Sequence, residues 1–101
     1  MTIFEEIIRE AQLLDWKLWI YIEPYDKLTS TLKVIVLDAD NEELGHDDFT
    51  PLVAENQGYK ELLSIHDLQG VLSNMKYSHN MDINKVIKHI AYYVEYDAYL
   101  A

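Results

Sequence analysis

The spacing of apolar residues changes from the period of a helix to the period of a strand near residue 15, and this change restricts the chain to a fold that mixes helices with strands. Over residues 3–14, apolar side chains recur along one arc of a helical wheel. Thr2 and Glu5 have the spacing of a capping box, which predicts that this helix begins at Thr2. Over residues 16–23 the period becomes two, which predicts a strand. One face of this strand is expected to carry Trp16, Leu18, Ile20 and Ile22.

The rest of the chain predicts two more strands and three more helices. Residues 32–37 form a nearly continuous apolar run, which is typical of a strand covered on both faces. The short connection favours an antiparallel hairpin with the first strand. The other expected elements are a short helix between Thr50-Pro51 and Gly58, a strand over residues 59–65, a helix capped by Asp67 that ends near Tyr77, and a last helix capped by Asp82.

The predicted order is therefore α-β-β-α-β-α-α. It belongs to the α+β class, with a small, mainly antiparallel three-stranded sheet packed against helices. The chain has 101 residues, and 50% of them are hydrophobic, so we expect one domain over residues 1–101 with a buried core. Cysteine is absent from the sequence, which excludes disulfides and thiolate metal sites. The first six residues lack the pattern of a signal peptide, and no apolar stretch is long enough for a membrane span, so we expect a cytoplasmic protein.

The charge is strongly negative, with eight Lys and Arg against 18 Asp and Glu, or −10 at pH 7. Nucleic-acid binding depends on cations that meet phosphates, so this chain is not expected to bind nucleic acid directly. A positively charged protein partner is favoured, because complementary charges accelerate association. The plainer interpretation is that the acidity keeps a small protein soluble.

The acidic residues concentrate after the second predicted strand, in a segment without Lys or Arg. An EF-hand register that begins at Asp38 fails, because position six is Glu43 and position twelve is Phe49. Two interpretations remain, a solvated loop and a docking site for Lys and Arg of a partner. The candidate partner-binding residues of this segment are Asp38, Asp40, Glu42, Glu43, Asp47 and Asp48.

Signals for catalysis are weak, so we expect no enzyme activity, no cofactor and no metal. The four histidines lack the spacing of a zinc-binding helix, and the three glycines are too far apart to cradle a phosphate. His46 beside Asp47 could form a base with an orienting carboxylate, and an enzyme that uses this pair is the weakest of the functional alternatives.

Tyrosine is the second unusual feature, with eight residues in the chain. In the last helix, Tyr92, Tyr96 and Tyr99 fall nearly opposite the core stripe, on the face that carries Lys85 and Lys88. Tyrosine suits a binding surface, since it buries a large area and can also form a hydrogen bond. The alternative is that another element covers this face or that the helix ends before Tyr96. The predicted core stripe of this helix is Ile83, Val86, Ile87, Ile90, Ala91 and Val94, with Tyr93 at its boundary.

Three segments together carry a family resemblance: residues 15–21 (DWKLWIY), 36–40 (VLDAD) and 92–99 (YYVEYDAY). They resemble small acidic bacterial proteins found among the immunity proteins of contact-dependent growth inhibition and related toxin systems. The resemblance implies a protein that binds a toxin domain, commonly a basic nuclease, and blocks its active site inside the cell. It assigns no toxin-contact residues, so the acidic segment as a contact surface is an inference from charge alone.

The alternative function is a general interaction or regulatory module, which includes a mimic of nucleic acid. A mimic needs carboxylates spread along an extended face, whereas here they concentrate in one segment.

Overall fold

The computed structural model describes residues 2–100, so Met1 and Ala101 of the expected domain lie outside the described residues. The predicted order α-β-β-α-β-α-α is confirmed, and two short 3₁₀ helices, η1 and η2, are added to it. The elements are α1 (Phe4–Glu10), η1 (Ala11–Leu13), β1 (Trp19–Ile22), β2 (Val34–Leu37), η2 (Ala39–Asn41), α2 (Leu52–Glu55), β3 (Lys60–Ser64), α3 (Ile65–Asn74) and α4 (Ile83–Tyr96).

The sheet has the order β2-β1-β3, and both pairings are antiparallel, which confirms the predicted hairpin. Ile20 in the central strand faces Val36 on one side and Leu63 on the other. The next residue of β1, Tyr21, pairs with Glu61, so Leu62 is an extra residue in β3 and forms a bulge. Bulges of this kind bend a strand and increase its local twist.

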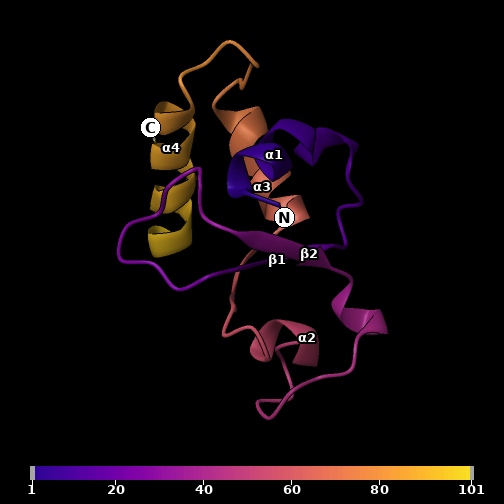
Figure 1. Ribbon diagram of the computed structural model, residues 1–101. Helices are drawn as coiled ribbons and strands as arrows, with labels where there is room; N and C mark the ends of the chain where they lie inside the picture. The colour runs from indigo at the N-terminus through magenta and orange to yellow at the C-terminus, as the bar shows by residue number, and fades with distance from the viewer. Residues whose placement is uncertain (1, 101) are drawn as a thin grey trace.

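Helices α1 and α3 lie on one side of the strands, while α2 lies on the other side (Figure 1). Alternate residues of β1, Ile20 and Ile22, face the first side and join the main core. The same core takes apolar side chains from the three longest helices. Its helical members are Phe4, Ile7, Ile8, Ile65, Leu68, Val71, Leu72, Val86, Ile87 and Ile90.

A second, thinner layer covers the opposite face of the sheet. Tyr21 points to that face, yet its side chain is only 1% exposed. The covering segment runs from the end of β2 through α2, in which Ala54 is fully buried. The prediction that residues 32–37 lie in a strand with both faces covered is confirmed for β2, where every residue is buried or half-buried.

The predicted helix start at Thr2 is wrong. No side chain caps α1. Its first amides are satisfied through tertiary contacts instead: the N–H of Phe4 donates to the carbonyl of Leu32 at 2.9 Å, and the N–H of Glu5 donates to the carbonyl of Ser30 at 2.9 Å. These backbone bonds provide the acceptors that a cap would otherwise supply.

Two other predicted caps are also wrong. Ser64, not Asp67, caps α3, and its hydroxyl accepts the N–H of Asp67 at 3.0 Å. Thr50 does not cap α2, because its own N–H and hydroxyl are bound to Asp47. The cap at Asp82 is confirmed: its carboxylate accepts the N–H of Asn84 at 2.9 Å.

Candidate functional site

The acidic residues 38–48 are mostly exposed, and hydrogen bonds give this segment, which we call the acidic unit, a defined conformation. Asp38 begins this unit, because its carboxylate accepts the N–H of Asp40 at 3.1 Å and the amide of Asn41 at 2.7 Å. A backbone bond of 2.7 Å from the N–H of Gly45 to the carbonyl of Thr50 closes the turn that follows.

Asp47 organises the tip of this turn. Its carboxylate accepts the N–H groups of Phe49 at 2.9 Å and Thr50 at 2.7 Å, and the hydroxyl of Thr50 at 2.7 Å. These hydrogen bonds favour the charged form and lower the pKa of Asp47 below its ordinary value. The carboxylate of Asp47 therefore holds the turn in shape.

His46 and Glu55 connect the turn to α2. The imidazole Nδ1 of His46 lies 2.6 Å from Oε1 of Glu55, and the backbone N–H of His46 donates to Oε2 at 2.9 Å. The side-chain hydrogen bond between His46 and Glu55, together with the negative charge of Glu55, raises the pKa of His46. The pair of His46 with Asp47, considered as the weakest alternative, is not formed, because the imidazole contacts Glu55 and both oxygens of Asp47 are bound within the turn.

Four of the six predicted acids have no partner for their carboxylates among the described residues; Asp40, Glu43 and Asp48 are exposed, and Glu42 is half-buried. Within residues 2–100, the carboxylates of Asp40, Glu42, Glu43 and Asp48 form no hydrogen bond and no ion pair. The structure thus separates the predicted set into Asp38 and Asp47, which shape the unit, and four acids that are available to a partner. We call these four residues the outward acids.

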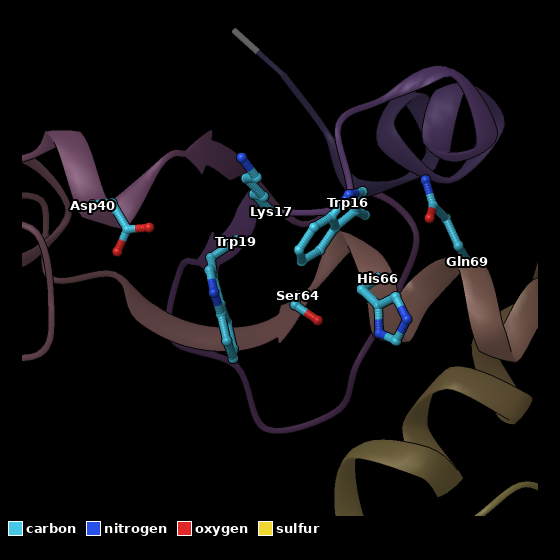
Figure 2. Close-up of a pocket in the computed structure, with 7 residues that line it drawn as sticks. All are labelled: Trp16, Lys17, Trp19, Asp40, Ser64, His66 and Gln69. Atoms are coloured by element: carbon cyan, nitrogen blue, oxygen red, sulfur yellow. The ribbon is translucent and has the colours of Figure 1, made fainter.

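A groove lined by both tryptophans includes one of the outward acids, Asp40 (Figure 2). Its volume is about 760 Å³. We call it the tryptophan groove. Asp40 from η2 is one of its lining residues, so the acidic unit and the aromatic side chains share one site. The groove is lined by Trp16, Lys17, Trp19, Asp40, Ser64, His66 and Gln69.

Backbone and side-chain hydrogen bonds fix the walls of the groove. The N–H of His66 donates to the carbonyl of Trp16 at 3.2 Å, which ties the turn before β1 to the start of α3. The amide of Gln69 donates to the carbonyls of Ala11 at 2.8 Å and Leu14 at 3.0 Å. The groove is therefore preformed in the folded chain.

Trp16 is 58% exposed, so its indole is accessible from solvent. The rings of Trp16 and His66 pack edge to face, with 6.2 Å between their centroids. The Nζ of Lys17 lies 5.8 Å from the centre of the Trp16 ring. This arrangement shows that the indole face can be approached by a cation.

The sequence predicted Trp16 within the first strand, on the face that carries Ile20 and Ile22, and this prediction is wrong. The strand begins only at Trp19, because the carboxylate of Asp15 accepts the N–H of Lys17 at 3.0 Å and forms a turn. That turn directs Trp16 outward. The order Asp-Trp-Lys before an apolar run is the signal that could have indicated it.

The three predicted binding tyrosines do not form one face. Tyr92 and Tyr96 are neighbours on α4, with ring centroids 4.6 Å apart. The helix ends at Tyr96, because Asp97 adopts a left-handed conformation. Tyr99 therefore lies beyond the helix and stacks on Tyr93, with ring centroids 5.6 Å apart.

The core stripe of α4 is confirmed except for Val94, which is 38% exposed near the end of the helix. Tyr93, expected at the boundary, is half-buried and packs against the core. Burial and the charge of Asp67 raise the pKa of Tyr93 to about 12. Helix α4 packs on α3, whereas the outward acids follow β2 on the side of α2, so the tyrosines and the acidic unit are separate surfaces (Figure 1).

Two further observations describe the molecule as a whole. Among residues 2–100, no three side chains of His, Asp or Glu are grouped so that they could hold a metal ion. Every helix in the described part of the chain is too short or too polar to cross a membrane.

Comparison with known proteins places the chain in a family without assigning it a role. No curated protein and no solved structure matches the sequence. A family model described as a domain of unknown function, DUF7716, matches residues 1–101. The chain therefore belongs to the DUF7716 family.

Proposed function

We propose that this protein binds and neutralises a positively charged protein domain, and that it acts as an immunity protein against a cognate toxin. The net charge of −10 and the resemblance of three segments to immunity proteins support this function. Complementary charge increases the rate at which such partners meet.

The observation that carries the proposal is that hydrogen bonds hold the acidic unit in one conformation. Asp38, Asp47 and Glu55 use their carboxylates to fix its backbone. The outward acids then project from a fixed frame, although like charges in one segment repel each other. A frame that is already ordered loses little conformational entropy when a partner binds, so more of the interaction energy contributes to affinity.

The first experiment is co-expression with the protein encoded by the adjacent gene, which the proposal expects to end in a basic toxin domain. We expect restored growth of the host and a complex that survives size-exclusion chromatography. A toxin that still stops growth while this protein is present at high level would contradict the proposal.

The second experiment assigns the surface. The variant Asp40→Asn, Glu42→Gln, Glu43→Gln and Asp48→Asn removes the outward acids but retains the carboxylates that shape the unit. We expect it to associate roughly tenfold more slowly at low salt, because steering by charge is lost.

The matched control removes four exposed acids elsewhere on the chain, through Glu6→Gln, Glu10→Gln, Asp26→Asn and Glu95→Gln. The net charge of the two variants is equal, so only the position of the charge differs. Equal association rates for both variants would exclude the acidic unit as the contact surface.

A further inference from the structure

We infer that the tryptophan groove holds an arginine side chain of the partner, with the guanidinium group between the indole of Trp19 and the carboxylate of Asp40. This inference rests on the proposed function and names the chemistry of the contact. Both residues line the same groove, and Figure 2 shows them toward one end of it.

The two tryptophan rings of the groove differ in whether a cation of the chain itself lies against them. At Trp16, the ammonium of Lys17 from the chain itself approaches the ring. Within residues 2–100, no cation approaches the ring of Trp19 in this way. The Trp19 end therefore has an indole face and a carboxylate. Lys17 also lines the groove and lies beside Trp19 in Figure 2, with its ammonium 5.8 Å from the centre of the Trp16 ring.

Asp40 supplies the negative charge at that end. Its backbone N–H is fixed by Asp38, so the residue has a defined position, and its own carboxylate has no partner among the described residues. The residue is exposed, and a carboxylate of this kind can receive two parallel hydrogen bonds from one guanidinium group.

Arginine fits this combination better than lysine. A guanidinium group is planar, so it stacks on an indole and forms a bidentate pair with a carboxylate at the same time. An ammonium group is compact and more strongly hydrated, and it can satisfy only one of these contacts well. A single neutral aromatic or aliphatic side chain would leave Asp40 unpaired within the interface, which is unfavourable.

The chain has two tryptophans, and both line the groove, so their indole N–H signals report on this site alone. We would titrate the protein with three capped tripeptides, Gly-Arg-Gly, Gly-Lys-Gly and Gly-citrulline-Gly, and follow the indole signals by NMR. Citrulline has nearly the shape of arginine but carries no charge.

We expect the arginine peptide to shift the Trp19 indole signal most, and the citrulline peptide to bind about tenfold more weakly, since it lacks the charge that both contacts require. Asp40→Asn should weaken binding of the arginine peptide to the level of the citrulline peptide. Asp26→Asn, an exposed acid outside the groove, should leave the affinity unchanged.

Equal affinity for the arginine and citrulline peptides would overturn the inference, and so would an Asp40→Asn variant that binds arginine normally. Indole signals that stay in place up to the highest soluble peptide concentration would overturn it as well.

The peptide titration uses no toxin, so it separates this inference from the proposed function. Normal neutralisation of the toxin by Asp40→Asn together with failed peptide binding would reject the arginine contact and leave the function standing. Selective arginine binding without any neutralisation would reject the function and leave the contact standing.

Discussion

The imidazole Nδ1 of His46 lies 2.6 Å from Oε1 of Glu55, and this contact joins the acidic turn to the helix that follows it. Because the contact raises the pKa of His46, the folded state binds the imidazole proton more tightly than the unfolded chain does. The stabilisation is therefore fully present below the ordinary pKa of His46, and it is lost as the pH rises through the raised value.

We expect His46→Gln to lower the melting temperature more at about pH 6 than at about pH 9, where the wild-type imidazole is neutral. Circular dichroism measures both values. His79→Gln, a change at another exposed histidine, serves as the control. An NMR titration in which His46 has its midpoint at or below 6.5 would show that the contact with Glu55 does not form in solution.

Asp47→Ala should loosen the acidic turn without unfolding the core. The variant removes the acceptor of the Phe49 and Thr50 amides, so hydrogen exchange at these two positions should accelerate strongly while exchange in β1 stays slow. Asp48→Asn is the control, because asparagine tolerates the positive φ of 59° at that position. Equal exchange rates at Thr50 in the two variants would rule out the role given to Asp47.

Ser64→Ala should cost about 1 kcal/mol in the free energy of unfolding, because it removes the cap of α3. Thr2→Ala should cost almost nothing, since no side chain caps α1. Urea unfolding of the two variants compares a cap that the structure contains with one that only the sequence predicted. A larger loss at Thr2 than at Ser64 would reverse this assignment.

Tyr21 and Tyr93 should ionise only at high pH. Burial, followed by the charges of Glu61 and Asp47, raises the pKa of Tyr21 to about 12. Burial and Asp67 raise the pKa of Tyr93 to the same range. Both raised values favour the protonated phenol in the folded state, so the stabilisation is complete below pH 10 and is lost as the pH rises toward 12.

An absorbance titration should therefore show a late phenolate step that decreases in Tyr21→Phe and in Tyr93→Phe. Tyr96→Phe changes an exposed ring and should leave the late step intact. A late step of undiminished size in both single variants would contradict the burial of these two phenols.

Gly70→Ala tests how the segment after α4 is held. A methyl group at Gly70 would lie 2.6 Å from the hydroxyl of Tyr99, so the Tyr99 ring must move. In the helix itself alanine is favoured over glycine by about 1 kcal/mol. We expect little net change in wild type and a gain close to that value in a Tyr99→Ala background. Equal effects of Gly70→Ala in both backgrounds, measured by urea unfolding, would show that Tyr99 does not rest on α3.

The order and type of the elements could be predicted, because each depends on the spacing of apolar residues within its own segment of the sequence. The alternation in β1 and the stripe of Val86, Ile87 and Ile90 in α4 each determine one element without reference to the rest. The ends of the elements could not be predicted as well. The amides of Phe4 and Glu5 are satisfied by carbonyls far away in the sequence, and only the folded chain brings these groups together.

The site was predicted in part for the same reason. Charge identified the acidic residues, but it could not distinguish Asp47, which binds its own backbone, from Asp40, which does not. A helical wheel placed Tyr99 with Tyr96, and one left-handed residue, Asp97, separates them. The tryptophan groove joins segments that are distant in the sequence, so no local pattern contains it.

Some carboxylates of this segment hold its backbone and others do not, and this difference affects how specificity for a new partner could arise. Asp38, Asp47 and Glu55 hold the shape of the segment through their carboxylates, while the carboxylates of the outward acids form no hydrogen bond or ion pair within residues 2–100. Under the proposed function, substitutions at Asp40, Glu42 and Glu43 would alter which partner is preferred without disturbing the core, whereas Asp48 is restricted by its positive φ of 59°. A protein that must follow a changing partner gains from this separation, because recognition varies one residue at a time on a scaffold that still folds.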